Sequence, residues 1–247
     1  MIKNIAMWSG PRNLSTAMMY SFASRTDCHV VDEPFYAAYL STTGIKHAMY
    51  KEIINDGVVD PKKVIERCIN SEFNGQQEHS IFYQKHMTKH MIPSIDRSWI
   101  GQVCNVFLIR EPAKVIASYH AKDQDPGLSD IGVVEQCEIF DRVCQKTGKA
   151  PTVIDSWDIL NDPKKMLSAL CKAINIDFQE NMLSWPTGPR SFDGIWAPHW
   201  YKSVWQSNGF STPSQKKPKV PDHLLDLLDT ANSYYDQLKG FALKGNA

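Results

Sequence analysis

The residues best suited to chemistry lie in a short polar turn, residues 10–16, which reads Gly-Pro-Arg-Asn-Leu-Ser-Thr. The turn follows an apolar run and precedes a helical pattern. Because the start of a helix leaves backbone N–H groups unpaired and carries partial positive charge, a turn in this place can hold an anion. Arg12 adds donors that match phosphate or sulfate oxygens, and Ser15 and Thr16 add hydroxyls. The pattern predicts a phosphate-binding loop.

Two other interpretations explain less of this turn. A Walker A loop needs Gly-Lys-Ser/Thr after its first glycine and four further residues. Counting from Gly10, these three places hold Ser15, Thr16 and Ala17. A simple helix cap explains Ser15 but neither Arg12 nor the second hydroxyl.

A second polar pair follows the apolar run at residues 105–109. Arg110 comes directly after this run, and Ser118 lies about two helical turns beyond it. Each has an ordinary alternative, since Arg110 can pair with Glu111 and Ser118 can face solvent. Their joint spacing favours a second anion site that adjoins the first loop.

Three further polar side chains follow predicted strands. Glu33 comes after the strand expected at residues 28–31, and Lys85 and His86 come after the strand expected at residues 80–84. Ligands of open α/β sheets bind at the carboxyl ends of the strands. Glu33 and His86 are therefore candidate proton acceptors, although a capping carboxylate and a core histidine are the plain alternatives.

The elements that must position these residues alternate between strand and helix. Strands are expected at residues 2–8, 28–31, 80–84, 105–109 and 151–154. Helices are expected at residues 15–25, 60–73, 87–99, 112–122, 131–146, 163–174 and 222–238. This alternation predicts an α/β fold with a central parallel five-stranded sheet flanked by helices. Residues 1–247 are expected to form a single domain, with a helical cap over 36–75 and a C-terminal loop and lid helix over 184–247.

These motifs resemble the sulfotransferase superfamily that uses 3′-phosphoadenosine 5′-phosphosulfate (PAPS). The first loop of that family, Pro-Lys/Arg-Ser-Gly-Thr-Thr, is similar to residues 11–16, with Asn13 and Leu14 where the family usually has Ser and Gly. The family's second motif, Arg-x-Pro-x5-Ser, is matched by Arg110, Pro112 and Ser118. Glu33 with Pro34 looks like the Glu-Pro segment of some members, and Lys85-His86 is similar to a Lys-x-His segment that lacks its middle residue.

The resemblance implies a three-layer P-loop-like fold and the transfer of a sulfuryl group from PAPS to a hydroxyl or amine of a small acceptor, such as an alcohol, phenol, sugar or amine. It implies donor-binding residues Gly10, Pro11, Arg12, Asn13, Leu14, Ser15, Thr16, Arg110 and Ser118. It implies catalytic roles for Arg12, Glu33, Lys85 and His86, with the choice of base between Glu33 and His86 left open. The scheme needs no metal, and the product 3′,5′-bisphosphoadenosine leaves as the acceptor attacks sulfur.

The composition restricts the partners and the cellular location that are expected for this chain. Lys plus Arg equals Asp plus Glu, at 27 each in 247 residues, so a nucleic-acid partner is not expected. No apolar run approaches the roughly 18 residues of a membrane span, and the start lacks a secretory pattern. Six scattered cysteines then indicate reduced thiols and a cytoplasmic location. The oligomeric state is left open.

Two alternatives to a sulfotransferase share these motifs. A P-loop small-molecule kinase is disfavoured because the Walker lysine is missing and no strand ends in a Walker B aspartate. A non-catalytic nucleotide- or sulfate-binding module would keep both anion sites but need no base.

Overall fold

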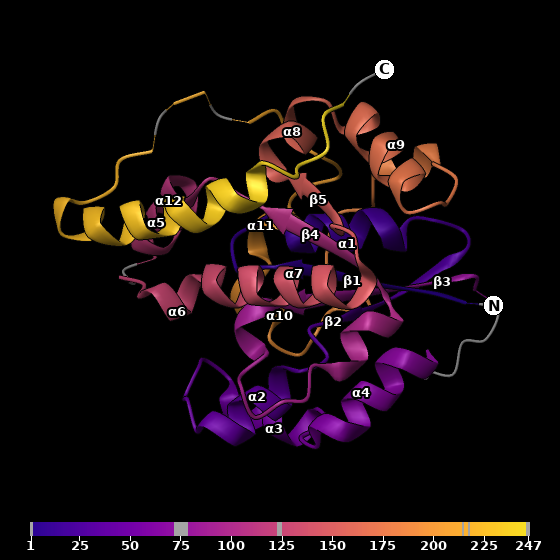
Figure 1. The fold of residues 1–247 in the computed structure, drawn as a ribbon, viewed down its shortest axis with the longest axis horizontal. Helices are drawn as coiled ribbons and strands as arrows, with labels where there is room; N and C mark the ends of the chain where they lie inside the picture. Colours follow the sequence, from indigo (N-terminus) through magenta and orange to yellow (C-terminus); the bar gives the residue numbers. More distant parts are fainter. Residues whose placement is uncertain (1, 72–78, 123–124, 214, 217, 246–247) are drawn as a thin grey trace.

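The computed structural model describes residues 2–71, 79–122, 125–213, 215–216 and 218–245. Its centre is a five-stranded sheet of parallel strands in the order β2-β3-β1-β4-β5 (Figure 1). The strands are β1 (Lys3–Ser9), β2 (Cys28–Asp32), β3 (Ile81–Met87), β4 (Cys104–Ile109) and β5 (Thr152–Asp155). The predicted α/β fold with a parallel five-stranded sheet is confirmed.

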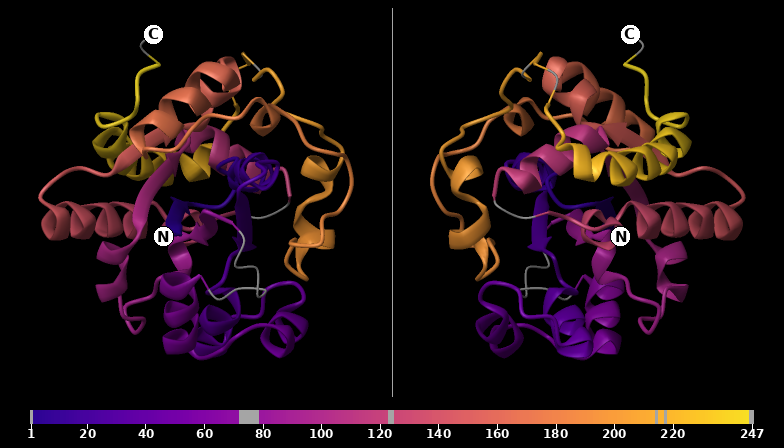
Figure 2. Two further views of the ribbon diagram at one scale, coloured as in Figure 1. Left: turned by 90° about the vertical axis from the view of Figure 1, so that its right-hand side faces the viewer. Right: turned by 90° about the vertical axis from the view of Figure 1, so that its left-hand side faces the viewer.

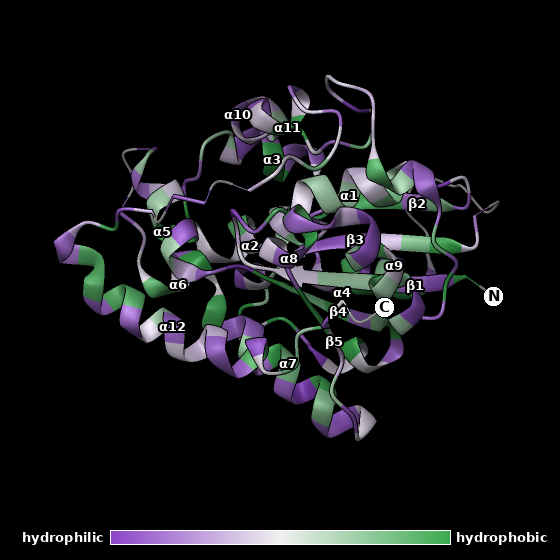
Figure 3. Ribbon diagram, turned by 90° about the horizontal axis from the view of Figure 1, so that it is seen from above, coloured by the Kyte–Doolittle hydropathy of each residue, from purple (hydrophilic) through white to green (hydrophobic). Residues whose placement is uncertain are grey.

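Helices cover both faces of the sheet because alternate residues of each strand point to opposite sides. On β1, Ile5 and Met7 pack into one core and Ala6 and Trp8 into the other. The first core is covered by α1 (Ser15–Ala23) and α9 (Pro163–Ala173). The second core is covered by α7 (Val133–Thr147) and α12 (Leu225–Lys239), and Figure 3 shows the two pairs on opposite sides. The result is a three-layer arrangement.

Strand β3 differs from the prediction because it runs on to Met87 and contains Lys85 and His86. The polar run from Gln84 to His86 suggested a strand end, but β3 lies between β1 and β2 and is buried along its length. The helix predicted over 87–99 is wrong. The chain forms two short 3₁₀ turns there, η1 (Thr88–His90) and η2 (Ser98–Gln102).

A capping side chain and a glycine set the ends of some helices. Asp60 caps α4 (Pro61–Asn70) by accepting a hydrogen bond from the Lys62 N–H at 2.9 Å. The helix predicted over 131–146 corresponds to α7, which begins at Val133 because Gly132 has a left-handed φ of 66°. Ile131 instead ends the short helix α6 (Leu128–Ile131).

A helix follows each of the strands β5 and β4, and only the helix after β4 was predicted from the sequence. Helix α8 (Ser156–Asn161) follows β5 directly and was not predicted. Helix α5 (Pro112–His120) follows β4 as expected. Residues 72–73, assigned to the predicted helix over 60–73, lie outside the described residues.

Helices α2 (Tyr36–Thr43), α3 (Tyr50–Asp56) and α4 lie together at one end of the molecule, as Figure 1 shows. They occupy the described part of the cap range, whose residues 72–75 lie outside the described chain. The division into one domain with a cap stays a prediction.

Residues 184–218, here called the late segment, contain two short helices, α10 (Ala197–Trp200) and α11 (Lys202–Trp205). Figure 2 shows this part of the chain (orange) running along one flank towards the cap helices. The ring of Trp196 meets that of Tyr36 in α2, with 5.0 Å between their centroids. Two 3₁₀ turns, η3 (Glu180–Leu183) and η4 (Asp222–Leu224), flank the segment. Within the described chain, no helix has the length and apolar character needed to cross a bilayer.

Candidate active site

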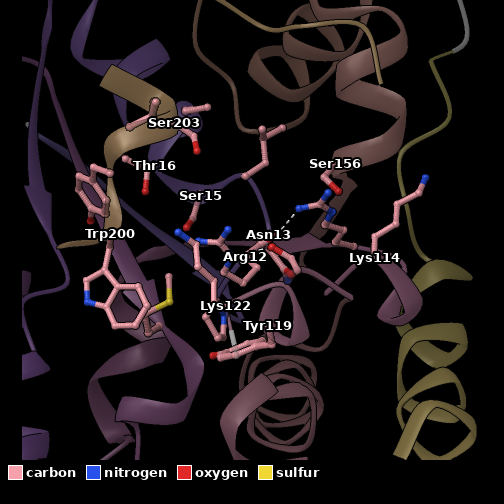
Figure 4. Close-up of a pocket in the computed structure, with 18 of the residues that line it drawn as sticks. Arg12, Asn13, Ser15, Thr16, Lys114, Tyr119, Lys122, Ser156, Trp200 and Ser203 are labelled. Carbon is pink, nitrogen blue, oxygen red and sulfur yellow. Dashed lines mark hydrogen bonds between the residues drawn. The ribbon is translucent and has the colours of Figure 1, made fainter. Parts of the chain in front are cut away.

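A cavity of about 1160 Å³ opens at the carboxyl ends of the strands. Its wall comes from the loops after β1, β2, β3, β4 and β5 and from the late segment. Figure 4 shows Arg12 and Ser15 near the middle, with Trp200 to one side and Ser156 to the other. Because pockets for one drug-sized ligand span about 300–1,000 Å³, this cavity has room for a nucleotide and a second small molecule.

The predicted anion loop, residues 10–16, forms one side of this cavity. Ser15 and Thr16 open α1 and line the cavity, and no side chain caps the helix start. The first N–H groups of α1 thus face a space that an anion can fill. Leu14 has a left-handed φ of 73°, which costs a non-glycine residue about 1–2 kcal/mol. This geometry explains why a Gly would suit the position.

Two residues, Gly10 and Asn13, support the shape of the loop, and Asn13 also lines the cavity. Gly10 does not line the cavity, and a Cβ there would lie 2.3 Å from the carbonyl oxygen of Ile131. Only glycine therefore allows this approach to α6. Asn13 is buried and donates from Nδ2 to the Leu108 carbonyl at 3.4 Å, which ties the loop to β4.

The two predicted anion sites adjoin each other in the structure. Arg12 Nε donates to Ser118 Oγ at 2.8 Å, and the Arg110 guanidinium donates to the Arg12 carbonyl. Burial, with Arg12 nearby, lowers the pKa of Arg110 from its ordinary value. Two guanidinium groups held this close favour an anion between or beside them.

A buried ion network lies at the ends of β2 and β3. Lys85 Nζ donates to Asp32 Oδ1 at 2.8 Å, to Glu33 Oε1 at 2.6 Å and to the Tyr201 hydroxyl at 2.6 Å. Burial raises the pKa of Glu33 from its ordinary value, Lys85 opposes that shift, and Asp32 adds to it. Burial alone would lower the pKa of Lys85, but Asp32 and Glu33 outweigh it and raise that pKa. Glu33 is thus a carboxylate whose affinity for a proton is increased.

Asp32 and Tyr201 are the site residues that sequence reasoning missed. Asp32 Oδ2 accepts from the Tyr201 hydroxyl at 2.6 Å and from the Gly194 N–H at 3.1 Å. Trp196 Nε1 donates to the Tyr201 hydroxyl at 3.2 Å. These bonds attach the late segment to the sheet edge. In the sequence, Asp32 stands next to Glu33, and residues 194–201 are rich in aromatic side chains. No local pattern links these two segments, which are far apart in the chain.

His86 lies apart from the other predicted site residues. It does not line the cavity, because Lys85 and Met87 take the cavity face of β3 and His86 takes the other. Its ring stacks on Trp8 with 4.4 Å between centroids, and burial lowers its pKa to about 3. Its Nε2 lies 3.0 Å from Gln84 Oε1. This geometry favours a core role for His86.

Positive charge dominates the described wall of the cavity. Its basic side chains number eight and its acidic ones four: Arg12, Lys46, Lys85, Lys89, Arg110, Lys114, Lys122 and Lys216 against Glu33, Glu111, Asp125 and Asp130. Such a wall attracts an anionic ligand although the whole chain has no net charge. Among the described residues, no group of three His, Cys, Asp or Glu side chains is placed to hold a metal ion.

Solved structures share this fold. A sulfotransferase domain from the olefin synthase of Synechococcus PCC 7002 aligns with a TM-score of 0.61 at 17% identity, over 94% of this chain and 95% of that one. A sulfotransferase from Alicyclobacillus acidocaldarius aligns with a TM-score of 0.53 at 10% identity, over 98% of both chains. At these identities the likeness concerns the fold.

The sequence itself matches both a family and longer relatives. Two proteins of Arabidopsis thaliana, named branched-chain-amino-acid aminotransferase-like proteins 1 and 2, are 36% and 34% identical over 235 residues. The match covers 95% of this chain and 41% of each relative, so the chain spans less than half of their length. A family model described as a sulfotransferase domain matches residues 2–242. The chain therefore belongs to the sulfotransferase domain family.

Proposed function

We propose that the chain is a PAPS-dependent sulfotransferase that acts on a hydroxyl or amine of a small molecule. One observation carries the proposal. The open start of α1 and the contacts of Arg12 with Ser118 and with Arg110 form one side of the cavity, and the Glu33–Lys85 pair lies on another. The arrangement supplies donors for anions beside a carboxylate with a raised pKa.

The residues present fit a donor with two anionic ends. The N–H groups and hydroxyls of residues 15–16, with Arg12, would hold the phosphosulfate end. Arg110 and Ser118 would hold the 3′-phosphate. The donor supplies the sulfuryl group, and these residues hold it and neutralise the charge that develops as bisphosphoadenosine leaves.

Glu33 would act as the base. The acceptor oxygen or nitrogen forms a bond to sulfur while the bond between sulfur and the leaving phosphate oxygen breaks, and the acceptor proton passes to the Glu33 carboxylate. Burial raises the pKa of this group, which improves it as a proton acceptor. Lys85 holds Oε1 of Glu33 through a 2.6 Å hydrogen bond and so orients the carboxylate. The other oxygen, Oε2, lies 4.0 Å from His90 Nε2 and takes part in no hydrogen bond among the described residues, so it would be available to the acceptor proton.

Binding separates this proposal from a kinase and from an aminotransferase-like activity. Calorimetric titration should show binding of 3′,5′-bisphosphoadenosine, with neither ATP·Mg²⁺ nor pyridoxal phosphate competing for it. Arg110→Ala should weaken that binding, whereas Lys172→Ala, at an exposed position of α9 outside the cavity, should not. Binding of ATP·Mg²⁺ alone would favour the kinase.

Turnover separates the proposal from a non-catalytic module. Glu33→Gln should bind bisphosphoadenosine like the wild type and lose transfer. Binding without transfer to any acceptor in a panel of alcohols, phenols, sugars and amines would favour the module.

A further inference from the structure

Lys89 is a half-buried cation without a partner. It lies in η1, directly after β3, and lines the cavity. Among the described residues, its ammonium makes no hydrogen bond and no ion pair within 4.0 Å. Glu33, Asp130 and Glu135 attract it from greater distances, while burial lowers the pKa of Lys89 from its ordinary value. A desolvated charge without a contact partner is costly unless a ligand completes it.

Lys89 lies on the part of the sheet edge that the donor does not need. The predicted donor contacts belong to the loop after β1 and to the region after β4, whereas Lys89 follows β3 and Glu33 follows β2. In the strand order β2-β3-β1-β4-β5, β2 and β3 lie on one side of the central strand β1, and β4 lies on the other. An acceptor that reaches Glu33 therefore approaches from the Lys89 side.

Among the described residues, the cavity wall near Lys89 is aromatic and carries no second half-buried cation that lacks a partner. Tyr36, His47, His90 and Trp196 line it, and the Tyr36 hydroxyl lies 2.9 Å from His47 Nδ1. Burial lowers the pKa of His47 to about 4 and lowers that of His90, so both rings are neutral at pH 7. An acceptor bound between these uncharged rings would therefore lie next to the positive charge of Lys89.

We infer that the acceptor carries an anionic group, a carboxylate or a phosphate, which pairs with Lys89 while its hydroxyl or amine reaches Glu33. This inference rests on the proposed function and names its substrate class. The aromatic rings would hold the apolar body of the acceptor between the two charged ends. Lys46 and Lys122 also line the cavity but are exposed, so solvent already satisfies them.

Matched probes test this assignment on the complex with bisphosphoadenosine. The carboxylate probe is 4-hydroxyphenylacetate and its neutral partner 4-hydroxyphenylacetamide; the phosphate probe is glycerol 3-phosphate and its neutral partner glycerol. The wild type should bind at least one anionic probe more tightly than its neutral partner, and which one does so distinguishes carboxylate from phosphate. Lys89→Met should weaken that probe about 10- to 100-fold, as expected for a hydrogen bond to a charged group, and should leave the neutral partner nearly unchanged.

Two further variants exclude a merely structural effect. Lys89→Arg should keep most of the preference for the anionic probe, and Lys172→Met, which removes an exposed positive charge of α9 outside the cavity, should change neither probe. The KM for the same probes in the transfer assay should follow their affinities. Equal loss for charged and neutral probes, or no preference in the wild type, would overturn the inference.

The failure of the proposed function has a different signature. It would appear as absence of bisphosphoadenosine binding in the wild type and in every variant alike. The same four probes are therefore also titrated into the free protein, where a preference that disappears in Lys89→Met supports the anion site by itself.

Discussion

Replacing Asp32 by Asn should lower the pKa of Glu33. Lys85 Nζ lies 2.8 Å from Asp32 Oδ1 and 2.6 Å from Glu33 Oε1, so these two carboxylate oxygens are at most 5.4 Å apart. At an effective dielectric constant of about 20, two unit charges at that distance repel each other by about 3 kcal/mol. Asp32 raises the pKa of Glu33, so removing its charge has the opposite sign.

The assay is the pH profile of kcat/KM. If Glu33 is the proposed base, it must be ionised to accept a proton, so its titration should set the acid limb, and activity should fall as the pH drops through its pKa. In Asp32→Asn the acid limb should move to lower pH, because a repulsion of about 3 kcal/mol that opposes the ionisation of Glu33 is removed. An acid limb that stays in place or moves to higher pH would refute the assignment of Glu33 as the base, or its coupling to Asp32.

Asp193→Asn is the matched control. Asp193 anchors the same late segment, accepting from the Tyr20 hydroxyl at 2.7 Å and from Trp205 Nε1 at 2.9 Å. It is not among the charges that shift the pKa of Glu33. Loosening of the segment alone would affect both variants, whereas the electrostatic effect should appear only in Asp32→Asn.

Three other predictions concern the loop, the base and the anion site. Arg110→Ala should weaken bisphosphoadenosine about 100-fold in titration calorimetry, because a charge-assisted contact is lost; unchanged affinity would contradict the second anion site. Glu33→Gln should reduce kcat by about 10²–10⁴ with the affinity for bisphosphoadenosine retained, whereas His86→Gln should keep kcat and lower the melting temperature; the reverse pattern would make the histidine the base. Gly10→Ala should lower the free energy of unfolding by about 1–3 kcal/mol in urea, because its Cβ would meet a backbone carbonyl at 2.3 Å. Gly240→Ala, where the nearest atom is 3.6 Å away, should be tolerated, and equal effects would count against the steric explanation.

The sheet and the anion loop could be predicted because their signals are local. The runs at 2–8 and 105–109 are apolar and each is followed by a polar turn and a helix, which is enough to predict parallel strands with their loops at one edge. Arg12 and Arg110 were placed at that edge for the same reason. Arg12 contacts Ser118, and its carbonyl accepts a hydrogen bond from Arg110, which agrees with the expectation that the two motifs adjoin.

The Lys85 network could not be predicted, because its partners are distant in the chain. Tyr201 is 116 residues from Lys85, and no local pattern links them. The polarity of Lys85 and His86 suggested a strand end, although tertiary contacts satisfy both inside β3. Which face of β3 carries each side chain depends on the register with β1, where Trp8 opposes His86. The predicted strand ended at residue 84, before both side chains. The sequence therefore did not show that Lys85 lines the cavity while His86 lies on the other face of β3.

Transfer of a sulfuryl group with Glu33 as the base remains a proposal that a product assay can decide. It is tested most directly by incubating the protein with PAPS and the acceptor panel and measuring sulfated product by mass spectrometry together with bisphosphoadenosine released. The wild type should yield equal amounts of sulfated product and bisphosphoadenosine, and Glu33→Gln should yield almost none of either. Product formation that Glu33→Gln leaves unchanged, or bisphosphoadenosine release without any sulfated product, would contradict the proposal.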